Sequence, residues 1–263
     1  MILGAMNNPL KPLIPQIQRY AELGFGFIDL TCEWPEALPA KLIKDEKKIK
    51  DALSTGKLGV VGHTVWYLPY SSPYPKVRNA AVAELKQAIE ALSRFNPRTV
   101  TVHPDVMHFS YKNRDQFLSH LFGSIGELDE FTREMGMTLV FEPYDEASLS
   151  TAELQEMFKR YPKVGFHLDV GHANFGSLNG DRIFRFINLF KSRLMHVHAS
   201  DNDGKGDQHL PIGAGKIKWA EACAALKKAN YDKTVTLEVF SQDPDFLPLS
   251  KKKFQEIWDK AKA

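Results

Sequence analysis

The chain has few of the features that mark membrane, secreted or nucleic-acid-binding proteins. It contains only two cysteines, Cys32 and Cys223, which are far apart and do not suggest a disulfide framework. It has no run of about 18 apolar residues, and its first residues do not form a charged-then-apolar leader. The 34 basic and 32 acidic residues leave a net charge of +2, which gives no strong indication of a nucleic-acid or membrane partner. These absences predict a soluble, cytoplasmic protein without a membrane partner.

Length and hydrophobic content indicate one large domain. With 263 residues, 43% of them hydrophobic, the chain can bury the core of an α/β barrel. The spacing of the expected elements leaves no linker, low-complexity tract or second domain. We therefore expect residues 1–263 to form a single domain.

Eight units of strand followed by helix can be traced along the sequence. The expected strands are 2–5, 27–31, 60–63, 99–103, 138–142, 164–169, 194–198 and 235–238. The expected helices are about 10–23, one within 41–55, 76–94, one ending near 135, 151–161, 181–189, 218–229 and 248–261. The helical period is clearest in 76–94, where one face carries Val77, Ala81, Leu85, Ala88, Ile89 and Leu92. This pattern predicts the α/β class and a single (β/α)₈ TIM barrel.

Six successive strands deliver ionisable side chains at or just beyond their carboxyl ends. These residues are His63, His103, Glu142, Asp169, His172, His198, Asp207, His209 and Glu238. In a (β/α)₈ barrel the carboxyl ends of all strands meet at one mouth. Five imidazoles and four carboxylates gathered there would repel one another or stay unpaired unless cations neutralised them. The sequence therefore predicts a divalent metal site at the mouth of the barrel.

Alternation within the strands predicts which side chains fill the barrel interior. Successive residues of a strand point to opposite faces, so the residues two positions before each ligand share its face. Among these residues are His167 and His196, which we expect one layer below the metal site, as partners of the ligands or as hydrogen-bonded fillers. The apolar residues of the opposite parity should pack against the helices. His108 and His120 are expected to be hydrogen-bonded core residues.

The motifs between Val60 and Glu238 resemble the xylose-isomerase-like barrel superfamily, and most closely its endonuclease IV branch. They are Gly62-His63-Thr64, Val102-His103-Pro104, Phe141-Glu142, Leu168-Asp169-Val170-Gly171-His172, His198-Ala199-Ser200-Asp201, Asp207-Gln208-His209 with the following Ile212-Gly213-Ala214-Gly215-Lys216-Ile217, and Leu237-Glu238. The resemblance implies up to three metal ions. One would bind His63, His103 and Glu142, a second Glu142, Asp169, His198 and Glu238, and a third His172, Asp207 and His209. These nitrogen and oxygen donors favour zinc, with manganese as the alternative.

Some features fit the sugar isomerase and epimerase branch better. Glu142, Asp169, His198 and Glu238 are also the single-metal set of those enzymes, so only the Asp207–His209 pair favours three metals. Gln208 replaces the nuclease arginine, Val170-Gly171 is isomerase-like, and Trp66 stands where the nuclease has tyrosine. Asp29 and Glu33 place carboxylates near the mouth, where a nuclease would need neutral or basic contacts to DNA.

Two enzyme functions follow from this resemblance. The leading interpretation is an endonuclease IV-like metal-dependent phosphodiesterase that hydrolyses DNA at abasic sites. The alternative is an isomerase or epimerase of a sugar or sugar phosphate, with Glu142 and Glu238 as the catalytic acid/base pair across a planar enediolate. Candidate phosphate contacts at the mouth are Lys112, Arg114, Lys205 and Lys216, and the Gly213–Lys216 loop forms either a phosphate-binding loop or a turn into the next helix.

Overall fold

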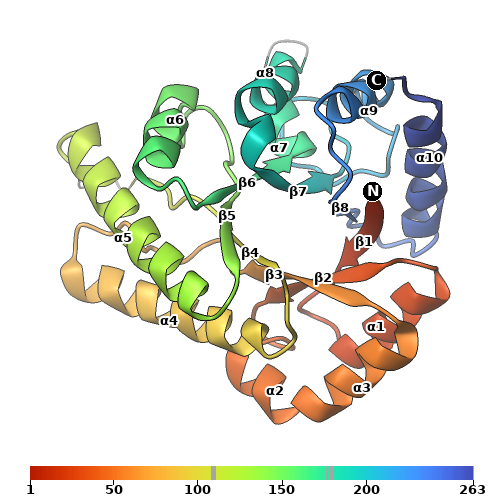
Figure 1. Cartoon of the computed structure of the whole chain (residues 1–263), viewed down its shortest axis with the longest axis horizontal. Helices are drawn as coiled ribbons and strands as arrows, with labels where there is room; N and C mark the ends of the chain where they lie inside the picture. Colours follow the sequence, from red (N-terminus) through yellow and green to blue (C-terminus); the bar gives the residue numbers. More distant parts are fainter. Residues whose placement is uncertain (108–110, 176, 178–179, 263) are drawn as a thin grey trace.

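The eight expected strands close into a barrel in chain order, and every neighbouring pair is parallel. The computed structural model describes residues 1–107, 111–175, 177 and 180–262. The strands are β1 (Ile2–Met6), β2 (Phe27–Cys32), β3 (Gly59–Thr64), β4 (Thr99–Val102), β5 (Thr138–Phe141), β6 (Gly165–Asp169), β7 (Leu194–Ala199) and β8 (Thr234–Leu237). Figure 1 shows them in the centre, with the helices arranged around them. The (β/α)₈ barrel is confirmed.

The helices follow the strands in the predicted order, with two local differences. They are α1 (Leu13–Glu22), α2 (Pro39–Lys44), α3 (Glu46–Gly56), α4 (Pro75–Ser93), α5 (Arg114–Glu134), α6 (Thr151–Arg160), α7 (Val170–Asn174), α8 (Asp181–Phe190), the short 3-10 helix η1 (Lys191–Arg193), α9 (Trp219–Lys228) and α10 (Phe246–Lys260). The single helix expected within 41–55 is two helices, α2 and α3, which meet at Asp45. The short helix α7 was not expected. It begins directly after β6, where the Asp169 side chain accepts a hydrogen bond from the backbone N–H of His172.

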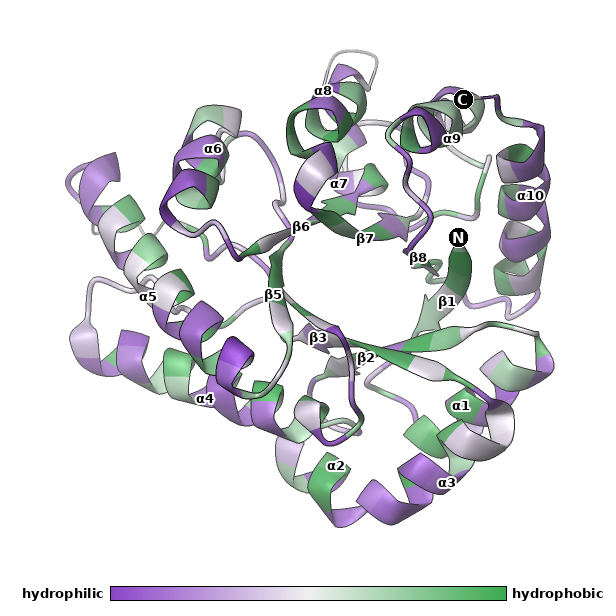
Figure 2. Cartoon of the chain, in the orientation of Figure 1, coloured by the Kyte–Doolittle hydropathy of each residue, from purple (hydrophilic) through white to green (hydrophobic). Residues whose placement is uncertain are grey.

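The core lies between the outer face of the barrel and the helices, as the alternation predicts. Phe166 points outward from β6 and packs its ring against Phe158, Phe186 and Phe190, with centroids 4.8–6.0 Å away. Figure 2 shows the strands in largely hydrophobic colours, whereas hydrophilic residues gather on the outer sides of the helices. Val77 is an exception to the predicted apolar face of α4, because its position in the first helical turn leaves it 45% exposed.

The start of α6 is held by a capping box and an ion pair. Ser150 accepts a hydrogen bond from the Glu153 backbone, and the Glu153 carboxylate accepts one from the Ser150 backbone. The same carboxylate binds Arg114 through two contacts of 2.8 Å. Arg114 is therefore engaged within the fold and is not the free phosphate contact that the sequence suggested.

In the part of the chain that the structure describes, no helix is long and apolar enough to cross a membrane.

Candidate metal centre

All nine predicted ligands lie at the carboxyl-terminal end of the barrel. His63, Asp169 and His198 belong to the ends of β3, β6 and β7. His103, Glu142 and Glu238 follow directly after β4, β5 and β8, His172 lies in α7, and Asp207 and His209 lie in the loop after β7. The closed sheet brings these ends together although the residues span most of the sequence.

Glu142 occupies the centre of the cluster. Its carboxylate is buried, and nitrogens of five histidines lie 3.1–3.7 Å from it. Its Oε2 faces His63, His103 and His167, and its Oε1 faces His172 and His198. Burial alone would raise the pKa of Glu142, but the surrounding imidazoles hold this pKa well below its usual value. A side chain in this position can contact two neighbouring ions, as predicted for it.

A second group forms around the imidazole of His198. Its Nδ1 lies 3.1 Å from Glu238 Oε2 and 3.8 Å from Asp169 Oδ2. The Oδ1 of Asp169 caps α7, so its Oδ2 remains for the site. Burial raises the pKa of Asp169 to about 7, and the neighbouring carboxylates add to this effect while His172 opposes it. A cation bound here would favour the charged form of this carboxylate.

The third predicted ligand group also comes together. His172 Nε2 lies 3.3 Å from Asp207 Oδ2, and His209 Nδ1 lies 3.4 Å from Asp207 Oδ1. His209 has a left-handed backbone with φ of +47°, which is uncommon for a residue with a side chain and often marks a functional site. Its ring packs against Phe240, with the centroids 4.8 Å apart. The loop is closed at its base, because Asp201 and Leu210 exchange two backbone hydrogen bonds of 2.8 and 2.9 Å.

Unsatisfied buried atoms show that the cluster fits metal ions. Glu142 Oε1, Asp169 Oδ2, His172 Nδ1 and Asp207 Oδ1 are buried and have no hydrogen-bond partner. Such atoms are costly unless something binds them. The clustered donors include His63–Glu142–His198, Glu142–Asp169–His172 and Asp169–His198–Glu238, each with one atom per residue within 4.8 Å of the others. Nitrogen and carboxylate donors at this spacing suit zinc or manganese.

A layer of polar side chains lies beneath the ligands, as expected for His167 and His196. His167 Nδ1 lies 3.0 Å from Thr101 Oγ1, and His196 Nδ1 lies 2.7 Å from Thr234 Oγ1. This layer also holds Asp29, which the sequence interpretation placed near the mouth. Asp29 is completely buried and lies within hydrogen-bonding distance of both His196 and His198. The alternation in β2 is the signal that could have placed it inside the barrel, because Ile28 and Leu30 take the outward parity.

The Gly213–Lys216 loop is a turn rather than a phosphate-binding loop. The N–H groups of Gly213 and Ile217 donate to the buried Asp201 carboxylate at 2.8 and 3.1 Å, and that of Lys216 donates to a backbone oxygen. These donors are therefore not available to a phosphate.

The two remaining predicted core histidines have different outcomes. His120 is half-buried, and its Nδ1 lies 2.6 Å from the Tyr111 hydroxyl, so it is hydrogen-bonded but not a fully buried core residue. His108 lies outside the described residues.

Residues 17–258 match the family described as the xylose isomerase-like TIM barrel. Because this match spans most of the chain, the protein belongs to that family. It is 26% identical over 240 residues to an uncharacterized protein of Methanocaldococcus jannaschii, covering 87% of this chain and 79% of the relative. It is 22% identical over 235 residues to the fructoselysine 3-epimerase of Shigella flexneri, covering 83% and 82% of the two chains.

Solved structures with the same fold include several sugar epimerases. A D-tagatose 3-epimerase-like protein superposes with a TM-score of 0.86 and 25% identity over 99% of both chains. A 3-keto-D-glucoside 4-epimerase from E. coli gives a TM-score of 0.78 with 16% identity, over 97% of this chain and 99% of the other. The IOLI protein with a bound zinc atom gives 0.79 with 16% identity over 99% of both. The two structures at 16% identity show that the fold is shared.

Proposed function

We propose that the protein is a divalent-metal-dependent epimerase or isomerase of a small sugar or sugar phosphate. The observation that carries this proposal is the placement of two carboxylates around one imidazole nitrogen. Glu142 on the β5 side and Glu238 on the β8 side lie 3.7 and 3.1 Å from His198 Nδ1. Two carboxylates that converge on one position can exchange protons with a substrate bound there from two directions. The named epimerases among the similar proteins support the same class of reaction.

The residues that would hold the catalytic metal are Glu142, Asp169, His198 and Glu238. When bound, the metal polarises neighbouring carbonyl and hydroxyl oxygens of the sugar and makes the adjacent C–H more acidic. The four side chains are buried at the mouth, so bulk water has little access to them. Burial keeps the enediolate away from bulk water during each transfer, and the carboxyl protons exchange with solvent between turnovers.

The two glutamates would divide the proton transfers between them. One carboxylate removes the proton from the carbon next to the carbonyl group, and the electron pair of the broken C–H bond moves into a planar enediolate of the sugar. The other carboxylic acid then returns a proton to the same carbon from the opposite face. The configuration of that carbon is inverted and no oxidant is consumed. Return of the proton to the neighbouring carbon would give an isomer instead.

Deuterium incorporation tests this mechanism. The protein is incubated in D₂O with a panel of ketoses and ketose phosphates and with manganese or zinc, and the products are separated and analysed by NMR. Each converted molecule should carry one deuterium at the inverted carbon. Glu238→Gln and Glu142→Gln should each stop epimer formation. Inversion without deuterium, or full activity of both variants with metal bound, would contradict the roles of the two glutamates.

A nuclease remains the second candidate because the third ligand group is complete in the structure. Asp207 lies between the other two ligands of this group, with its Oδ2 3.3 Å from His172 Nε2 and its Oδ1 3.4 Å from His209 Nδ1. Incubation with a duplex carrying one abasic-site analogue tests this function. Cleavage 5′ to the lesion that His209→Ala abolishes would support it. Conversion of a sugar in the same preparation, without cleavage, would leave the epimerase or isomerase.

A further inference from the structure

The buried Asp29 carboxylate lies directly beneath the ligand His198. Its Oδ2 is 2.8 Å from His198 Nε2, 2.9 Å from His196 Nε2 and 2.8 Å from Thr236 Oγ1. All four side chains are completely buried. Because a carboxylate only accepts hydrogen bonds once it is ionised, each of these neighbours must donate to it.

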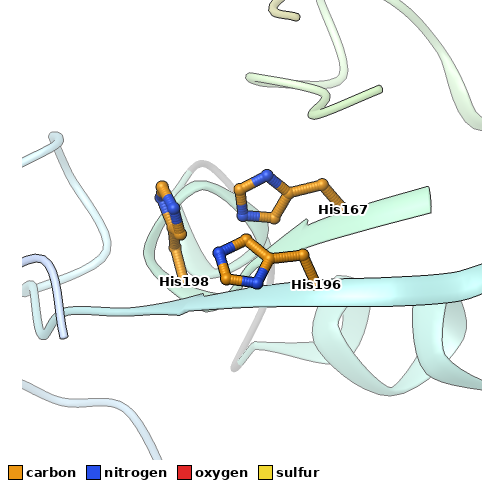
Figure 3. A group of neighbouring side chains, drawn as sticks. All are labelled: His167, His196 and His198. Carbon is orange, nitrogen blue, oxygen red and sulfur yellow. The ribbon is translucent and has the colours of Figure 1, made fainter. Parts of the chain in front are cut away.

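His167, His196 and His198 offer ligand atoms within 4.8 Å of one another, but both ring nitrogens of His196 are engaged, Nε2 by Asp29 and Nδ1 by the Thr234 hydroxyl. Figure 3 shows His167, His196 and His198 grouped on β6 and β7, and their ring centroids are 4.1–5.2 Å apart. Ligands of one tetrahedral zinc ion, each about 2.0–2.1 Å from the metal, lie roughly 3.3 Å from one another. The contacts of 2.8 and 2.9 Å to Asp29 are shorter than that and have the length of charge-assisted hydrogen bonds.

The hydrogen bonds also assign the proton on each ring. His196 Nε2 donates to Asp29, so in the neutral ring its Nδ1 accepts from the Thr234 hydroxyl at 2.7 Å. By the same reasoning His198 Nε2 carries the proton that binds Asp29. Its Nδ1 faces Glu238, Asp169 and Glu142, and a proton that it donates to Glu238 at 3.1 Å would be released when a metal ion takes its electron pair.

We propose that Asp29 is a positioning residue that holds His198 as the Nε2–H tautomer, with Nδ1 directed at the metal site. A carboxylate behind an imidazole ligand fixes the orientation of its ring and makes it a better donor to metal. The role rests on the metal requirement of the proposed function but not on the identity of the sugar. It can therefore be tested without any substrate.

The first test uses the unaltered protein. Long-range ¹H–¹⁵N NMR of histidine-labelled, zinc-loaded protein distinguishes a protonated from an unprotonated ring nitrogen, and loss of one signal in His198→Gln assigns the resonance. With zinc bound, His198 should show a proton on Nε2 and none on Nδ1. A proton on Nδ1 would overturn the proposal.

The second test measures manganese binding to metal-free protein by titration calorimetry and electron paramagnetic resonance. Asp29→Asn keeps the shape of the side chain but removes its charge, and we expect a loss of affinity of about 10–100-fold. Asp129→Asn is the matched control, because Asp129 is also buried but lies on α5 with Arg133, outside the barrel. This control should bind manganese like the unaltered protein. Equal affinity of folded Asp29→Asn would refute the role of Asp29.

The outcomes separate this inference from the proposed function. Weakened manganese binding by Asp29→Asn, in a protein that converts no sugar, would leave the positioning role intact and remove the epimerase. Sugar conversion that recovers in Asp29→Asn at saturating manganese would support both. If Asp29→Asn does not fold, the tautomer of His198 in the unaltered protein decides.

Discussion

Replacing Glu142 with glutamine tests whether the cluster is catalytic rather than structural. The change keeps the size of the side chain and removes the one negative charge that faces five imidazole nitrogens at 3.1–3.7 Å. We expect metal affinity to fall, because Glu142 is the only predicted ligand of two ions. Loss of a general acid or base alone lowers turnover by about 10²–10⁴-fold, and loss of the metal adds to this.

The stability of Glu142→Gln should change far less than its activity. Hydrogen bonds to a charged group contribute about 1.5–3 kcal/mol each, but the buried carboxylate also loses a desolvation cost when it becomes neutral. The histidines around it can release their protons, so no uncompensated charge is left behind. We expect the free energy of unfolding to fall by about 1–3 kcal/mol. Each kcal/mol of this loss should lower Tm by roughly 2–4 °C. The apolar layer around Phe166 is not touched.

Three measurements on the same preparation decide the outcome. They are sugar conversion, metal content by elemental analysis, and thermal unfolding followed by circular dichroism without added metal. Glu127→Gln on the surface of α5 is the control for the same chemical change, since the Glu127 side chain is 55% exposed and forms an ion pair with Lys86. Global unfolding of Glu142→Gln would refute the reasoning and make the carboxylate a structural element. Full activity with intact metal content would refute its catalytic role.

Three further predictions concern the metals and the fold. Elemental analysis and anomalous scattering should find three divalent ions per chain, and His209→Ala should lower the count by one; a single ion in the unaltered protein would remove the three-metal hypothesis. The hydrogen bonds from Arg114 lower the pKa of Glu153 to about 2. They therefore stabilise the folded protein above the ordinary carboxyl pKa, and this stabilisation is lost as pH falls towards 2. In urea unfolding Glu153→Gln should therefore cost about 1–2 kcal/mol at pH 7 and almost nothing near pH 2. Leu85→Ala should cost about 2–5 kcal/mol, whereas Val77→Ala, at an exposed position of the same helix, should stay within about 0.5 kcal/mol.

The sequence predicts the barrel well because its signals are local and repeated. Each strand is a short apolar run, and in six of the eight a predicted ligand at or just after the end marks the carboxyl end of the barrel. The short helix α7 has too few residues to show a helical period, and it depends on a hydrogen bond from the backbone of His172 to Asp169. The break between α2 and α3 at Asp45 carries no glycine or proline, so nothing in the local sequence indicates it.

The sequence predicts that the nine candidate ligands converge, but it does not predict their internal arrangement. The convergence of the nine ligands follows from the topology of the barrel. The position of Asp29 beneath His198 depends on contacts between residues 169 positions apart, which no local pattern contains. The choice between nuclease and epimerase is also outside the reach of the motifs, since Glu142 and Glu238 serve both interpretations.

The closed base of the loop after β7 places Asp207 and His209 on one short segment. Because Asp201 and Leu210 join the two ends of this loop by hydrogen bonds, the segment between them begins and returns at nearly the same place. A short loop costs less entropy to close than a long one. Two of the three outer ligands are therefore carried by one closed loop, whereas the inner four lie at or just after the ends of strands that are fixed by the barrel.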